Sequence, residues 1–102
     1  MCQEGPYTLV VRPGARRDVR RKQRYLEREN PHIAQVFLDD IGRALAIIAE
    51  APRRWAEWIC GIHRYPLLRF HVTIYYRILD AEVHILRALD PRRHPDTWRR
   101  PP

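Results

Sequence analysis

Apolar residues repeat with two different periods in this chain, and the period changes at Pro52. Before that residue, apolar side chains recur at steps of three and four: Ile33, Phe37, Ile41, Ala44 and Ile48. This spacing predicts an amphipathic helix from Pro31 to about Ala51. After it, residues 70–78 alternate between apolar side chains and His, Thr, Tyr or Arg, which predicts a strand with one buried face. Both periods in one chain favour an α+β fold.

Two patterns precede the amphipathic helix. Residues 7–12 alternate and are rich in β-branched side chains, so they predict a short strand, which the turn signal at 13–14 ends. Residues 15–29 then follow a helical pattern whose outer positions are strongly basic. The break at Asn30-Pro31 is only a few residues long, which favours an antiparallel two-helix hairpin.

Two further apolar segments flank residues 70–78. Residues 61–66 and 83–89 are predicted to be strands, and with 70–78 they would form a three-stranded antiparallel meander. We therefore expect a four-stranded antiparallel sheet, made of the N-terminal strand and the meander, with the helix hairpin on one face. The length suits a single domain over 1–102, with a disordered tail beyond residue 98.

Charge indicates the kind of partner. The net charge is +7, which attracts polyanions or an acidic protein. No segment is long and apolar enough to span a membrane and no secretory signal is visible, so we expect a cytoplasmic protein. The two cysteines, Cys2 and Cys60, and the five scattered histidines lack the spacing of a metal site or a disulfide framework. We expect no metal and no cofactor.

Four arginines in the second half are candidates for a shared binding face: Arg64, Arg77, Arg92 and Arg93. Arginine suits forked contacts to phosphate or carboxylate. Arg77 is the strongest single candidate, because strand alternation places it opposite the core. The alternative is that each arginine is solvated or pairs locally with Asp90, Asp96 or Glu82.

Other basic and aromatic residues have simpler explanations. The arginine-rich run at residues 16–24 is more often a solvated helix face, and we expect no direct DNA binding by it. Trp55 and Trp58 could anchor a partner, although packing at the open end of the hairpin is the favoured interpretation. Trp98 could bind a partner or cover the sheet edge.

Cleavage of RNA needs a base, an acid and cations near the phosphate. His71, His84, His94 or Tyr75, together with Arg77, could supply these groups. A single histidine is more often structural, and the sequence does not bring these residues together.

Three short motifs occur in order along the second half. Arg64 enters the meander, Tyr76-Arg77 ends its middle strand, and Arg92-Arg93-His94 follows its last strand, before Trp98. This ordered set resembles the RelE/ParE superfamily of toxins from bacterial type II toxin–antitoxin systems. The resemblance extends over about residues 7–98 and implies a small curved sheet with helices on one face. It also implies a surface that binds the target or the antitoxin, formed by Arg64, Arg77, Arg92, Arg93, His94 and Trp98.

Departures from the superfamily pattern indicate the branch. Asp90 stands where many relatives have histidine, Lys22 takes a usually apolar position, and Trp98 lies near the place of the tyrosine of mRNA-cleaving members. The chain is therefore more similar to the ParE branch, which implies a non-enzymatic inhibitor of DNA gyrase with a cognate antitoxin. The alternatives are a RelE-like, metal-independent endoribonuclease that acts on mRNA at the ribosome, and a non-toxic basic binding module.

Overall fold

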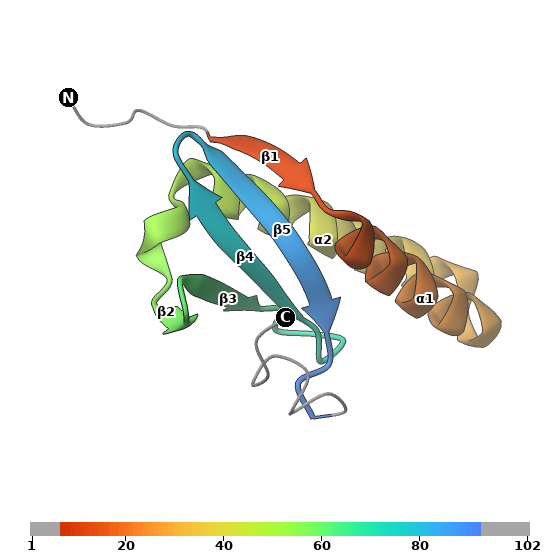
Figure 1. The fold of residues 1–102 in the computed structure, drawn as a ribbon. Helices are drawn as coiled ribbons and strands as arrows, with labels where there is room; N and C mark the ends of the chain where they lie inside the picture. The colour runs from red at the N-terminus through yellow and green to blue at the C-terminus, as the bar shows by residue number, and fades with distance from the viewer. Residues whose placement is uncertain (1–6, 93–102) are drawn as a thin grey trace.

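Eight elements follow one another in the computed structural model, which describes residues 7–92. In chain order they are β1 (Thr8–Val11), α1 (Pro13–Glu29), α2 (Pro31–Glu50), the 3₁₀ helix η1 (Pro52–Arg54), β2 (Glu57–Ile59), β3 (Ile62–Pro66), β4 (Thr73–Leu79) and β5 (Glu82–Leu89). Figure 1 shows the two helices as a hairpin that projects beyond the sheet. The predicted α+β order of strand, helix hairpin and meander is confirmed.

The helix hairpin is bounded by residues with clear local roles. Asn30 ends α1 and caps α2, because its side-chain oxygen accepts a hydrogen bond of 2.9 Å from the backbone N–H of His32. The interpretation of Pro13-Gly14 as a turn was wrong, since α1 begins at Pro13. Proline is well tolerated in the first turn, where its missing N–H has no partner to lose. A Cβ at Gly14 would lie 3.0 Å from Arg87 Cδ, so this glycine allows α1 to approach β5 closely.

The sheet differs from the expected four antiparallel strands. It has five strands in the order β1-β5-β4-β3-β2, and β1 pairs with β5 in parallel, from Thr8 opposite Glu82 to Val11 opposite Ile85. The added strand, β2, has three residues, which is too short to show an alternating pattern. The direction of β1 was not predictable because no hairpin joins it to its partner.

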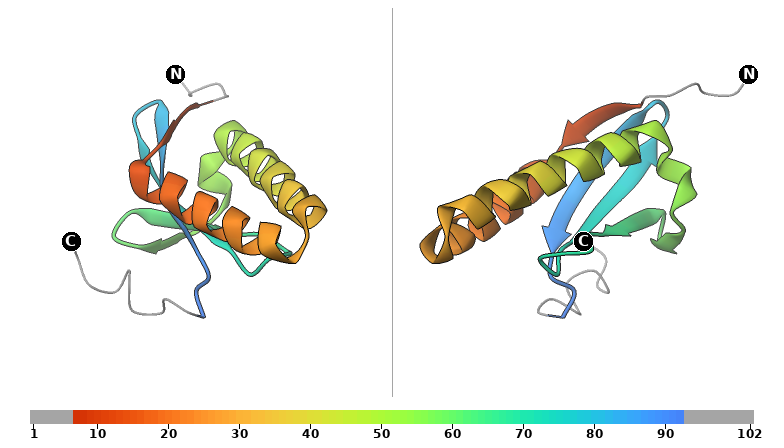
Figure 2. Two further views of the ribbon diagram at one scale, coloured as in Figure 1. Left: turned by 90° about the vertical axis from the view of Figure 1, so that its right-hand side faces the viewer. Right: turned by 180° about the vertical axis from the view of Figure 1, so that it is seen from behind.

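The helices cover the sheet unequally. Seen from behind, α2 crosses the rear face of the sheet, whereas α1 lies beside β5 beyond the end of β1 (Figure 2). The core between α2 and the sheet contains the largest fully buried side chains, among them Phe37, Ile48, Ile74, Tyr76 and Val83. The opposite face of the sheet, called the front face below, is turned to the viewer in Figure 1.

Strand β4 is buried on both faces, which corrects the expectation of one apolar and one polar face. It begins at Thr73, because Phe70 and His71 have φ angles of 71° and 51° and belong to a turn. Thr73 and Tyr75 are 6% and 3% exposed on the front face. There Tyr75 packs in a second, smaller cluster with Ile62 and Leu89, and the half-buried Trp58 and Leu86 pack against it. Strand β4 is central, so it has a neighbouring strand on each side, and the side chains of Trp58 and Leu86 cover its front face.

The hydroxyl of Tyr76 ties the sheet to the end of the helix hairpin. It donates a hydrogen bond of 2.7 Å to the carbonyl of Pro52, its ring stacks on His63, and burial raises its pKa to about 12. A folded-state pKa above the ordinary value of 10 gives stability that is complete below pH 10 and is lost as pH rises toward 12.

We predict that Tyr76→Phe lowers the free energy of unfolding by about 1–1.5 kcal/mol at pH 7, because the Pro52 carbonyl loses its donor. The difference between the two proteins should shrink between pH 10 and 12, since only the tyrosine can ionise. Urea unfolding at pH 7, 10 and 11.5 checks both statements. A difference that is constant with pH would contradict the assignment.

Candidate functional site

The front face of the sheet brings two of the predicted arginines together. Arg64 lies opposite Tyr75, and Arg77 lies opposite Ile62, so alternation along β3 and β4 directs both side chains to the same face. Diagonal neighbours of this kind lie about 7–8 Å apart in regular antiparallel pairs. Arg64 and Arg77 therefore form one small basic patch, and His84 lies opposite Arg77 on the next strand.

Both arginines rest on well-defined partners. The guanidinium of Arg64 lies 5.5 Å from the ring centroid of Trp58, and that ring packs 5.3 Å from Tyr75. Arg77 donates a hydrogen bond of 2.8 Å to the carbonyl of Cys60, in the turn between β2 and β3. Cations held beside a partly exposed apolar floor suit binding to an acidic or amphipathic protein surface. We call Arg64, Arg77, Trp58 and Tyr75 the front patch.

Of the other predicted site residues, Arg92 does not join the front patch. Arg92 follows β5 and turns back onto Asp90, to which its side chain donates hydrogen bonds of 3.3 and 3.2 Å. These bonds lower the pKa of Asp90. This arrangement is the local pairing considered as the alternative for Arg92. Arg93, His94 and Trp98 lie outside the described residues.

A buried ion pair that the sequence interpretation missed joins α1 to β5. The carboxylate of Asp18 is 2% exposed and accepts two hydrogen bonds from Arg87, of 2.7 and 3.0 Å. It also accepts the backbone N–H of Ala88 at 2.9 Å. The Asp18 carboxylate thus accepts the backbone N–H of β5 at Ala88, beyond the point where β1 ends and no longer pairs with β5. The available signal was a lone acid on the apolar stripe of one helix and a lone arginine in an apolar strand.

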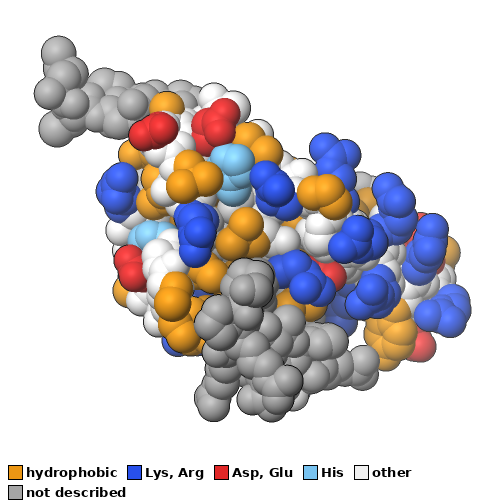
Figure 3. Space-filling view, in the orientation of Figure 1, with side chains coloured by type: hydrophobic (Ala, Val, Ile, Leu, Met, Phe, Trp, Pro, Cys, Tyr) orange, Lys and Arg blue, Asp and Glu red, His pale blue; other side chains and the backbone are white. Residues whose placement is uncertain are grey.

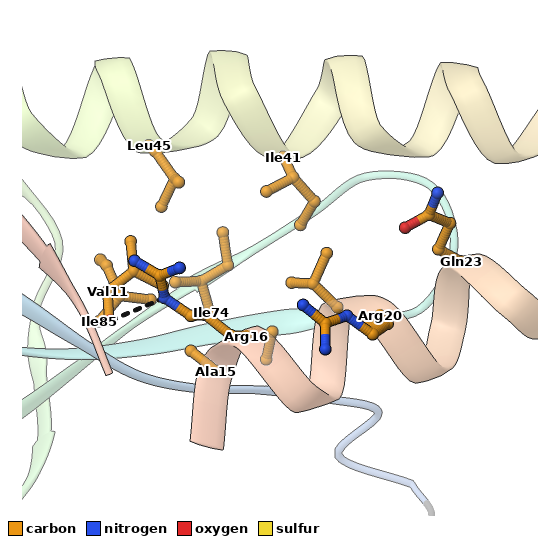
Figure 4. Close-up of a pocket in the computed structure, with 11 residues that line it drawn as sticks. Val11, Ala15, Arg16, Arg20, Gln23, Ile41, Leu45, Ile74 and Ile85 are labelled. Atoms are coloured by element: carbon orange, nitrogen blue, oxygen red, sulfur yellow. Dashed lines mark hydrogen bonds between the residues drawn. The ribbon is translucent and has the colours of Figure 1, made fainter. Parts of the chain in front are cut away.

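An apolar groove lies between the two helices, on the side of α1 that faces α2 (Figure 4). Its volume is 330 Å³, and Ile41 and Leu45 of α2 point into it. Arg16 and Arg20 of α1 lie at its rim, and Arg16 donates a hydrogen bond to the carbonyl of Val11. A concave apolar surface with cations at its edge can bind an amphipathic segment. We call it the helix groove.

A second hollow lies on the other side of α1, where β5 ends. It has a volume of 460 Å³ and is lined from α1 by Arg21, Lys22 and Arg28. The turn before β4 and the segment after β5 complete it with His71 and Arg92. Lysine and arginine side chains gather over α1 in Figure 3, whereas the sheet beside it is mixed. We call this hollow the basic cavity.

Of the histidines considered for acid–base chemistry, His71 and His84 are separated in the structure, and His94 lies outside the described residues. His84 contacts Glu82 at 2.9 Å. His63, which was not a candidate, is bonded to the Trp55 carbonyl at 2.7 Å and stacked on Tyr76. His71 lines the basic cavity at the opposite end of β4 from His84. Residues 7–92 bring no three His, Cys, Asp or Glu side chains together as metal ligands. Within the same residues, no helix is long and apolar enough to cross a membrane.

His71 has a strained backbone at the wall of the basic cavity. Its φ of 51° lies in the left-handed region, which costs a residue with a Cβ roughly 1–2 kcal/mol. We predict that His71→Gly raises the free energy of unfolding by about 0.5–1 kcal/mol, since glycine removes the strain but is more flexible when unfolded. His71→Ala keeps the Cβ and should change stability little. Thermal melts of the three proteins test this, and an equal gain in the alanine variant would refute it.

Comparisons with known proteins point in one direction. Residues 9–95 match the family model described as "ParE toxin of type II toxin-antitoxin system, parDE". The fold is similar to a chain of the chromosomal ParDE toxin–antitoxin system from P. aeruginosa, with a TM-score of 0.70 and 20% identity over 81% of this chain and 94% of the other. It is also similar to a chain of the toxin–antitoxin complex RelBE2 from Mycobacterium tuberculosis, with a TM-score of 0.57 and 24% identity over 85% and 93% of the two chains. No curated protein sequence matches this chain.

Proposed function

This chain belongs to the ParE toxin family of type II toxin–antitoxin systems, and on that premise we propose that it inhibits DNA gyrase by binding it through the front patch. The family membership confirms the resemblance drawn from the motifs around Arg64, Tyr76-Arg77 and Arg92. Family membership does not specify the target or the mode of action. For these we propose DNA gyrase as the target and inhibition by binding, without hydrolysis of a nucleic acid.

One observation carries the proposal: Arg64 and Arg77 share the front face of the sheet with the partly exposed ring of Trp58. Such a combination is typical of protein–protein interfaces, where arginine and aromatic residues are enriched. The two candidate histidines within residues 7–92 support binding over catalysis, because His84 is held by Glu82 and lies at the opposite end of β4 from His71. Cleavage would need an acid and a base beside one phosphate.

The helix groove supports a second part of the proposal, namely neutralisation by a cognate antitoxin. An amphipathic segment of that partner would place apolar side chains between Ile41 and Leu45, with its acidic residues near Arg16 and Arg20. The proposed location of both events is the bacterial cytoplasm, where gyrase acts on the chromosome.

The experiment compares two reactions of the purified chain. It is incubated with DNA gyrase and relaxed plasmid, and in parallel with ribosomes that are translating a defined mRNA. Loss of supercoiling with intact mRNA supports the proposal. Cleaved mRNA with normal supercoiling would replace it with the RelE-like alternative, and no effect in either reaction would leave only a basic binding module.

A further inference from the structure

The basic cavity is built from two parts of the chain that are distant in sequence. Helix α1 contributes Arg21, Lys22 and Arg28, and the segment after β5 contributes Arg92. Its floor is apolar and consists of Val72, Ala88 and Leu89. The cavity therefore joins cations at the rim to an apolar base.

The two acids that line this cavity are already neutralised within the chain. Asp18 is held by Arg87 and by the backbone N–H of Ala88, and Asp90 is held by Arg92. None of the ion pairs within residues 7–92 includes Arg21, Lys22 or Arg28. Lys22 lies 5.3 Å from the ring centroid of Tyr25, which holds its charge at the rim. The positive charge of the rim thus remains available to an external anion.

The apolar floor distinguishes between the kinds of anion. A phosphodiester backbone presents phosphates and polar sugars and has no aliphatic side chain to cover Val72 and Leu89. Two rings on which a base could stack line the cavity: that of Tyr25, which Lys22 already contacts, and the imidazole of His71. An acidic, amphipathic peptide carries carboxylates and aliphatic side chains on the same segment. Its carboxylates can pair with the cations of the rim while its aliphatic side chains cover the apolar floor.

A strained backbone provides independent support. Phe70 and His71 both have positive φ angles, and Phe70 is fixed by its ring contact of 5.3 Å with Phe37 in the core. This anchoring holds His71 at the cavity wall despite its backbone cost. Strained residues of this type concentrate at functional sites.

We propose that the basic cavity binds an acidic, amphipathic segment of a protein partner, with its carboxylates on Arg21 and Arg28 and an aliphatic side chain on the floor. The inference rests on the proposed function, because the antitoxin is the partner expected to carry such a segment. It adds a second contact area to the helix groove, on the opposite side of α1.

The test uses a synthetic helical peptide with leucine on one face and glutamate on the other. Its affinity for the unaltered chain is measured by titration calorimetry and its position by amide chemical shifts. The altered chain is Arg21→Glu with Arg28→Glu. The control is Arg17→Glu with Arg24→Glu, two exposed arginines of the same helix that do not line the cavity. Both doubles change the net charge equally.

We expect the cavity double to weaken peptide binding about tenfold or more and the control double by about threefold at most, since exposed charges act mainly at long range. A twin peptide with glutamine in place of glutamate should also bind weakly. Equal losses in the two doubles, or shifts away from α1 and Leu89, would overturn the proposal. So would undetectable peptide binding, or tighter binding of a thymidine oligonucleotide at the same residues. Peptide binding and gyrase inhibition are separate readouts, so failure of one is distinguishable from failure of the other.

Discussion

Asp18→Ala is expected to lower the free energy of unfolding by about 3 kcal/mol, because it breaks a buried ion pair. The substitution leaves the Arg87 guanidinium, whose side chain is 32% exposed, without its carboxylate, and the N–H of Ala88 without an acceptor. The partial exposure of Arg87 places the effect at the low end of the range for broken buried pairs. In a domain of this size the midpoint of thermal unfolding should fall by roughly 10–20 °C.

Three further variants separate the contributions to this effect. Arg87→Ala leaves a buried unpaired carboxylate and should be as harmful, whereas the double variant should lose less than the sum of the two singles. Asp39→Ala is the control, because Asp39 is exposed and, within residues 7–92, accepts a hydrogen bond only from Gln35; it should change stability by less than about 0.5 kcal/mol. Urea unfolding measures all four proteins. A loss below about 1 kcal/mol for Asp18→Ala would show that the pair does not hold α1 on β5.

Arg64→Glu combined with Arg77→Glu is expected to reduce inhibition of gyrase supercoiling on the order of 100-fold, provided that the front patch is the working surface. Reversal of two neighbouring charges opposes an acidic partner and leaves the apolar floor in place. The measurement is the concentration of the chain that halves supercoiling, and the midpoint of thermal unfolding confirms that the variant is folded.

A matched control places the same charge change elsewhere. Arg43→Glu combined with Arg53→Glu alters two exposed arginines, one on α2 and one in η1, and should retain inhibition within about threefold. Because Arg77 also bonds to the Cys60 carbonyl, Arg64→Glu alone serves as a variant that spares the β2–β3 turn. A folded front-patch double that inhibits as strongly as the control would move the working surface away from this face.

The candidate site was predictable only in part. Alternation placed Arg77 opposite the core, because strand period is a local property, and the register of β3 with β4 puts Arg64 on the same face. The fate of Arg92 was not predictable, since its pairing with Asp90 depends on the turn that follows β5. The basic cavity could not be predicted from the sequence either, because its residues come from three separate segments: α1, the turn before β4 and the segment after β5.

The sequence by itself determined the order and type of the main elements. Each of the patterns used extends over a few residues: the three- and four-residue spacing of α2, the cap at Asn30 and the alternation around Ile74. Such local patterns identify the helix or strand in which they occur. Only the tertiary structure decided the parallel pairing of β1 with β5 and the contact of Asp18 with Arg87, which are 69 residues apart. Such contacts depend on how helices and strands pack against one another. The spacing of residues along one helix or strand does not indicate which other helix or strand it will contact.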